Sequence, residues 1–99
     1  MKNYITEFIG TFFLVLTIGL TGDPLAIGVM LMVMVYMGGH ISGAHYNPAV
    51  SIAMIFRGLL TTKEAINYIL SQLIGAFLAA IFVQWVGGPI MEVGPSNTA

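Results

Sequence analysis

The amino-acid sequence predicts an all-α membrane protein with three transmembrane helices and one re-entrant half-helix. The chain of 99 residues is 58% hydrophobic and only 7% charged, with a mean hydropathy of +0.94, whereas soluble domains carry about 25% charged residues. Three apolar segments, at about 4–21, 25–41 and 63–86, have the length that a membrane span requires. Between the last two, residues 42–58 contain glycine and proline, and we interpret them as a re-entrant loop and half-helix.

The first span, about 4–21, ends in a turn. Pro24 excludes Asp23 from helical backbone angles, which favours a chain reversal there. Lys2 before an apolar run would also fit a secretory signal. Glu7 interrupts that run, and no small-residue cleavage site follows before the next apolar segment, so we expect a retained helix.

The second span, about 25–41, is rich in methionine, which is typical of adaptable packing rather than of a ligand site. The third span, about 63–86, follows a polar corner. Thr62 is the expected N-cap of this helix, and Glu64 suits its first turn. We treat residues 1–88 as one unit and residues 89–99 as a polar tail.

A half-length helix is predicted between the second and third spans. Asn47 is a good N-cap because its side-chain oxygen can accept a backbone N–H of the first turn. Pro48 suits the first helical position, where no N–H is needed. The chain then stays apolar to about Gly58. Some ten residues reach roughly 15 Å, about half of a hydrocarbon core.

Several function classes are excluded by composition. Without cysteine there is no disulfide framework and no thiolate metal site, and His40 and His45 do not suffice for a metal centre. A net charge of −1 offers no basic patch for nucleic acid. No nucleophile and base occur at a usable spacing. We therefore expect no catalytic residue, no metal and no cofactor, and the protein is not expected to be an enzyme.

The charges predict an orientation. With a cytoplasmic N-terminus, Lys2, Arg57 and Lys63 all lie inside, while Asp23 and Glu92 lie outside. This is the positive-inside pattern. We expect an integral, multi-pass protein of the plasma (inner) membrane.

Three stretches resemble one protein family. The stretch Ser42-Gly43-Ala44-His45-x-Asn47-Pro48-Ala49-Val50 resembles the first signature loop of the aquaporin and glycerol-facilitator (major intrinsic protein) family. Glu7-Phe8-Ile9-Gly10-Thr11 resembles the start of that family's first helix, and Gln72-x-x-Gly75-Ala76 resembles its third. The resemblance covers nearly all of residues 4–86 and implies one half of the inverted-repeat aquaporin fold.

The resemblance implies a passive channel for water, and for small neutral solutes such as glycerol. Backbone carbonyls of the loop would accept hydrogen bonds, and Gly43 and Ala44 would allow them to form a close, extended run. Asn47 would donate its amide into the pore, and apolar side chains would form the facing wall. The implied pore-lining residues are Asn47, Gly43, Ala44, His45, Tyr46, Ile27, Leu31 and Val50. The implied half-helix cap is Asn47, Pro48 and Ala49, and the implied loop supports are Glu7, His45 and Gln72.

The sequence departs from the family pattern at two positions. Ile27 stands where water-selective relatives usually place an aromatic residue, so selectivity for water alone does not follow. In the family, the arginine of the pore constriction follows the second Asn-Pro-Ala motif. In this sequence Val50 follows the one Asn-Pro-Ala motif, residues 47–49. Arg57 is too far along the half-helix to replace it.

One repeat cannot enclose a pore, because the pore of an inverted-repeat protein lies between the repeats. We expect the lipid bilayer and a second, inverted half-unit as partners, and hence an oligomer. Three sources remain open: an antiparallel homodimer, a separate chain, or a longer channel of which this sequence is part. Half the copies of a homodimer would have to insert against the charge bias. The alternative function is a non-conducting three-span protein that acts by packing against others.

Overall fold

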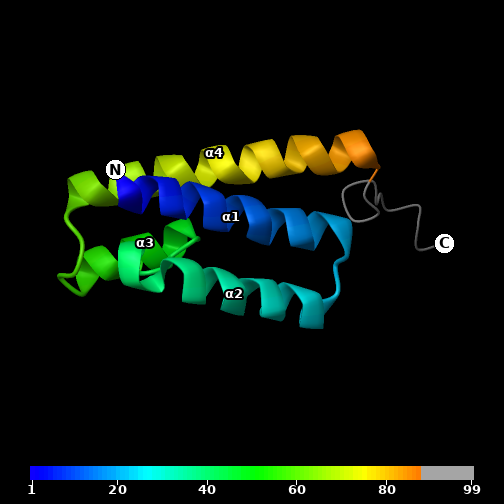
Figure 1. Ribbon diagram of the computed structural model, residues 1–99. Coiled ribbons are helices and arrows are strands. Elements are labelled where there is room, and N and C mark those ends of the chain that lie inside the picture. The colour runs from blue at the N-terminus through cyan, green and yellow to red at the C-terminus, as the bar shows by residue number, and fades with distance from the viewer. Residues whose placement is uncertain (88–99) are drawn as a thin grey trace.

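The computed structural model describes residues 1–87, and over this range it contains four helices (Figure 1). They are α1 (Lys2–Leu20), α2 (Pro24–Ser42), α3 (Pro48–Phe56) and α4 (Thr62–Val86). Helices α1, α2 and α4 are long and apolar enough to cross a membrane, and α3 has 9 residues. The expected fold class is therefore confirmed. The expected tail, with Glu92, lies outside the described residues.

Helix α1 lies between α2 and α4 and packs against both (Figure 1). It runs antiparallel to α2 and parallel to α4, since Glu7 contacts Gln72 near one end and Gly19 faces Val83 near the other. Helix α3 packs against α4 and occupies only the end of the bundle that holds the N-terminus.

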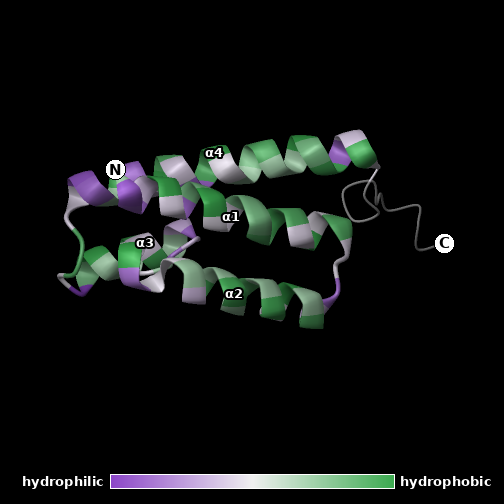
Figure 2. Ribbon diagram, in the orientation of Figure 1, coloured by the Kyte–Doolittle hydropathy of each residue, from purple (hydrophilic) through white to green (hydrophobic). Residues whose placement is uncertain are grey.

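The surface of the bundle is apolar. Large hydrophobic side chains are exposed on all four helices, and Figure 2 shows polar residues gathered toward the two ends of the bundle. Several of the fully buried side chains are polar, among them Glu7, Ser51 and Gln72. This inside-out pattern suits a lipid surround, because lipid does not drive apolar side chains inward.

Helix α2 begins at an N-cap, Asp23, where the sequence predicts only a turn. Asp23 has extended backbone angles, as Pro24 requires, and its Oδ2 accepts the N–H of Ala26 at 3.0 Å. The helix ends at Gly43, whose φ of 89° places it in the left-handed region that glycine adopts without strain.

The expected N-cap of α4 was wrong by one residue. Thr61, not Thr62, is the cap: its hydroxyl accepts the N–H of Glu64 at 3.1 Å. The Glu64 carboxylate in turn accepts the N–H of Thr61 at 3.0 Å. This reciprocal pair requires the acidic residue three positions after the cap, which places the cap at Thr61.

The contact of α1 with α4 depends on small residues. A Cβ at Gly75 would lie 2.6 Å from the carbonyl oxygen of Phe8, so only glycine allows this approach of the two backbones. Ala79 and Val83 continue the same buried face of α4. The closely packed α1–α4 pair is the scaffold that holds the loop and α3.

Candidate functional site: a re-entrant helix and its supporting network

Helix α3 is re-entrant. The chain leaves the end of α2, turns inward through residues 43–47 and returns along α3 to the same end of the bundle (Figure 1). Nine helical residues rise about 14 Å, roughly half of a hydrocarbon core. The N-terminus of α3 is therefore its inner tip.

Asn47 occupies this tip. Its Oδ1 accepts the N–H of Ala49 at 2.8 Å, and its carbonyl accepts the N–H groups of Val50 and Ser51 at 3.1 and 3.2 Å. Pro48 takes the first helical position. Asn47 is exposed, and within residues 1–87 its Nδ2 bonds to no protein acceptor. The tip thus presents an amide donor outward.

The loop before the tip is not the extended strand that was expected. Gly43, Ala44 and Tyr46 all have positive φ, at 89°, 55° and 52°. Left-handed backbone is unfavourable for residues that carry a Cβ. The expectation failed because it considered only small residues, whereas tertiary hydrogen bonds force the turns.

Glu7 of α1 holds the loop in this shape. Its Oε2 accepts the Ser42 hydroxyl at 2.6 Å and the His45 N–H at 3.0 Å. Its Oε1 accepts the Tyr46 N–H and the Gln72 Nε2–H, both at 2.8 Å. A fully buried carboxylate therefore meets four donors from three parts of the chain.

A second set of contacts ties α3 to this network. The Gln72 Nε2 also donates to the Ser51 hydroxyl at 3.0 Å, and Ser51 Oγ lies 2.9 Å from His45 Nδ1. Gln72 thus bonds Glu7 and α3 rather than the loop backbone. The His45 ring also lies beside that of Tyr68, with centroids 4.8 Å apart.

The Tyr46 side chain turns into the bundle. A Cβ at Gly10 of α1 or at Gly38 of α2 would overlap the tyrosine side chain, so these glycines leave the space that it fills. Its hydroxyl donates to the carbonyl of Met34 at 2.7 Å. Only the backbone of Tyr46 remains available to line a pore.

The carbonyl groups of residues 43–46 stay free. Within the part of the chain that the structure describes, their oxygens accept no hydrogen bond from the protein, whereas the N–H groups of Ala44, His45 and Tyr46 are all bonded. The loop thus has its donors satisfied and its acceptors available.

The apolar residues of the predicted site are more distant. Ile27 and Leu31 lie on α2, about 24 and 18 Å along the helix axis from the start of the loop, by a rise of 1.5 Å per residue. By helical spacing they share a face with Gly38, which faces the Tyr46 side chain, and with Ser42, whose hydroxyl accepts the Ala44 N–H. Val50 is half-buried in the first turn of α3.

Sequence reasoning assigned no role to several residues of this network. Ser42 links Glu7 to the Ala44 N–H, and Tyr68 donates to the Ser42 carbonyl at 2.8 Å. Tyr68 precedes Gln72 by four residues, so helical spacing places both on one face of α4. This four-residue spacing is the sequence signal by which Tyr68 could have been assigned to the network.

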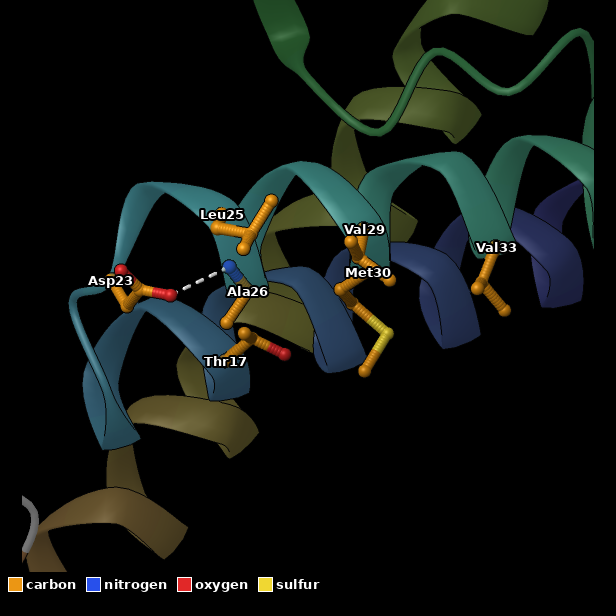
Figure 3. Close-up of a pocket in the computed structure, with 7 residues that line it drawn as sticks. All are labelled: Thr17, Asp23, Leu25, Ala26, Val29, Met30 and Val33. Carbon is orange, nitrogen blue, oxygen red and sulfur yellow. Dashed lines mark hydrogen bonds between the residues drawn. The ribbon is translucent and has the colours of Figure 1, made fainter.

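A mostly apolar groove lies away from this network. A space of about 450 Å³ opens between α1 and α2 at the end opposite α3 (Figure 3). It is mostly apolar, and its one carboxylate, that of Asp23, caps α2. No residue of the predicted site lines it. In residues 1–87 no group of three or more His, Asp or Glu side chains is arranged for a metal ion.

Comparisons with known proteins identify the family. The family model of the major intrinsic protein matches residues 1–98. The chain is 38% identical to Aquaporin NIP1-1 of Arabidopsis thaliana over 102 residues, which cover 89% of this chain and 34% of that protein. It is 42% identical to Glycerol uptake facilitator protein-like 6 of Lactiplantibacillus plantarum over 93 residues, covering 85% of this chain and 43% of that protein.

A third relative, Aquaporin Z of Photorhabdus laumondii, is 40% identical over 95 residues, 81% of this chain and 41% of that protein. The chain therefore spans less than half the length of these relatives. No solved structure matches it. With three helices able to span a bilayer and a family match over almost its whole length, the chain is an integral, multi-pass membrane protein that belongs to the major intrinsic protein family.

Proposed function

We propose that the chain forms half of a passive channel for water, and for small neutral solutes such as glycerol, whose pore is completed by a second unit inverted in the membrane. The observation that carries this proposal is the tip of α3. There Asn47 caps the helix with its oxygen and keeps its amide donor free. A channel rather than an enzyme fits this arrangement, because the relatives are named aquaporins and a glycerol uptake facilitator.

The tip and the loop together suit a neutral, polar permeant. The N-terminus of a helix carries about half a positive charge, which opposes cations and protons. The free carbonyls of residues 43–46 supply acceptors beside the Asn47 donor. Water and glycerol carry both donors and acceptors. Such groups replace part of the hydration of a permeant without holding it tightly.

A second unit is needed because irregular backbone at membrane depth must face protein or a water-filled cavity. Asn47 and Gly43 are exposed on this unit. In inverted-repeat transporters the permeation site lies near the midplane between two repeats. The relatives are named aquaporins and a glycerol uptake facilitator. Ile27 is smaller than the aromatic residue that water-selective relatives usually place at this position. We therefore include glycerol among the permeants.

The membrane orientation belongs to the same proposal. We place the N-terminus and the α3–α4 corner on the cytoplasmic side of the plasma membrane, because Lys2, Arg57 and Lys63 lie at that end. The tip of α3 then points outward from the cytoplasmic side to the middle of the bilayer.

The test uses a tandem of two copies. Three spans put the start of α1 and the end of α4 at opposite ends (Figure 1). A second copy fused after the first therefore begins on the far side and inserts inverted. Tandem and single chains are reconstituted in liposomes, and stopped-flow light scattering measures osmotic water permeability. We expect the tandem to exceed empty liposomes.

Asn47→Asp in both copies should lower water permeability about fivefold to tenfold. Aspartate still caps the helix, but the amide donor is lost, and one hydrogen bond is worth about 1 to 1.5 kcal/mol. Gln84→Glu is the matched control, since it makes the same amide-to-carboxylate change at an exposed site near the far end of α4. It should leave permeability unchanged.

Two permeability results would contradict the proposal. One is a correctly inserted tandem with the permeability of empty liposomes, which would favour the non-conducting alternative. The other is an equal loss of permeability in the Asn47 variant and the Gln84 control. A proton current through the tandem would exclude the proposed role of the α3 tip.

A further inference from the structure

All three lysine and arginine residues of the sequence lie at one end of the bundle. Lys2 begins α1, Arg57 follows α3, and Lys63 lies in the first turn of α4. The side chain of Asn3 donates to the Tyr68 hydroxyl at 3.3 Å, which joins the first turn of α1 to the second turn of α4. Figure 1 shows the α3–α4 connection at this same end. The positive charge is therefore concentrated in space.

The connection between α3 and α4 also exposes large apolar side chains. Phe56 is 87% exposed and Leu59 is 67% exposed, on either side of Arg57. We call residues 56–63 the basic corner. The nearby carboxylate, Glu64, is engaged by the N–H and hydroxyl of Thr61 at the start of α4. Cations interleaved with exposed apolar groups are typical of surfaces that lie at the boundary of headgroups and acyl chains.

The length of α1 places the basic corner at headgroup depth. Its 19 residues rise about 28 Å, close to the thickness of the hydrocarbon core. The corner lies beside the start of α1, so it meets the headgroup layer of one leaflet. The other end has no lysine or arginine and carries Asp23 instead, with Trp85 80% exposed on α4.

We propose that the basic corner binds the headgroups of anionic phospholipids. Arg57 and Lys63 contact the phosphate groups, and Phe56 and Leu59 insert among the adjoining acyl chains. Each basic side chain that lies close to an anionic membrane surface raises the affinity for that surface by about fivefold. The guanidinium group also matches the paired oxygens of a phosphate. This binding requires only insertion in a bilayer and is independent of conduction.

The sole tryptophan of the chain makes a direct test available. The reporter variant carries Phe56→Trp and Trp85→Phe, and Leu59→Trp with Trp85→Phe is the second reporter. Each is reconstituted in phosphatidylcholine bilayers that contain brominated phosphatidylglycerol or brominated phosphatidylcholine. Bromine quenches tryptophan fluorescence on contact, so the two titrations give the relative affinity of the site for each lipid. We expect phosphatidylglycerol to be preferred by about fivefold or more.

Charge variants decide the cause of the preference. Arg57→Gln with Lys63→Gln should bring the affinity ratio at the reporter close to one, while Arg57→Lys with Lys63→Arg should preserve it. The unmodified chain, which reports from Trp85 at the other end, should show no preference. Equal affinity for both lipids at both reporters, or a preference that survives neutralisation of Arg57 and Lys63, would overturn the proposal.

Discussion

At the scale of single residues, Glu7 determines the shape of the loop. Burial of a carboxylate in an apolar bundle is costly unless hydrogen bonds replace its hydration. Four donors do so here, from Ser42, His45, Tyr46 and Gln72. The same bonds satisfy loop N–H groups that would otherwise be buried without partners. Glu7 and the loop thus stabilise each other.

Glu7→Gln should lower the free energy of unfolding by about 2 to 4 kcal/mol. The amide nitrogen would replace an oxygen that accepts two hydrogen bonds, and each buried donor left without a partner costs about 1 to 3 kcal/mol. Denaturant titration in detergent micelles measures the change. Glu64→Gln is the control, with an expected change below about 0.5 kcal/mol, since glutamine also forms the capping box. Equal effects of the two variants would refute the supporting role of Glu7.

Tyr46 shows how the loop sustains an unfavourable conformation. Its φ of 52° costs of order 1 to 3 kcal/mol for a residue with a side chain. The ring fills the space between Gly10 and Gly38, and the hydroxyl bonds the Met34 carbonyl. Close van der Waals contact of the ring, the hydroxyl hydrogen bond and the bond from the Tyr46 N–H to Glu7 offset strain of that size. The side chain anchors the loop, whose carbonyls at residues 43–46 accept no hydrogen bond from residues 1–87.

At the scale of helices, the closeness of α1 and α4 allows Glu7 and Gln72 to meet. Lipid provides no hydrophobic drive for helix association, so close van der Waals contact and interhelical hydrogen bonds must supply it. Gly75 follows Gln72 by less than one turn and faces the backbone of Phe8. A larger residue there would separate the helices beside the Glu7 network.

Gly75→Ala should therefore destabilise the protein by about 1 to 3 kcal/mol, the usual range for overpacking. The obstructing atom is a backbone carbonyl 2.6 Å from the added Cβ, which no rotamer change removes. Gly28→Ala in α2 is the matched control, because an added Cβ there meets nothing within 4 Å. Thermal unfolding in detergent micelles measures the stability of the two variants and of the unmodified chain. A loss at Gly28 as large as that at Gly75 would contradict the packing explanation.

At the scale of the whole molecule, the bundle is polarised along the membrane normal. The basic corner, the start of α1 and the end of α3 occupy one end, and the α1–α2 turn with Asp23 occupies the other. We propose that this charge distribution sets the insertion of the unit, and with it the direction of the α3 tip.

Since the chain has no cysteine, single cysteines can report its topology. Thr62→Cys, at an exposed position of the basic corner, should react with a membrane-impermeant maleimide only after cells are permeabilised. Leu25→Cys, 75% exposed at the start of α2, should react in intact cells. The unmodified chain controls for background labelling. Reaction of both cysteines in intact cells would show dual insertion, which is what an antiparallel homodimer needs.

Much of the fold followed from local features of the sequence. Apolar segment length determined the spanning helices, and Asp23, Pro24, Asn47 and Pro48 determined helix boundaries through capping and ring geometry. Capping and proline ring geometry act between residues that are close in the sequence, so they can be predicted from the sequence alone. The N-cap of α4 also has a local signal, because Thr61 and Glu64 stand at the spacing of a capping box.

Only the tertiary structure decided the conformation of the loop and the partners of its side chains. Ser42, His45 and Tyr46 bond to Glu7, which is 35 to 39 residues away in sequence. The left-handed angles of Ala44 and Tyr46 are unfavourable in isolation and persist because those distant contacts outweigh the strain. The helices were therefore determined by the sequence itself, whereas the shape of the loop was decided by contacts that exist only once α1, α2 and α4 have packed together.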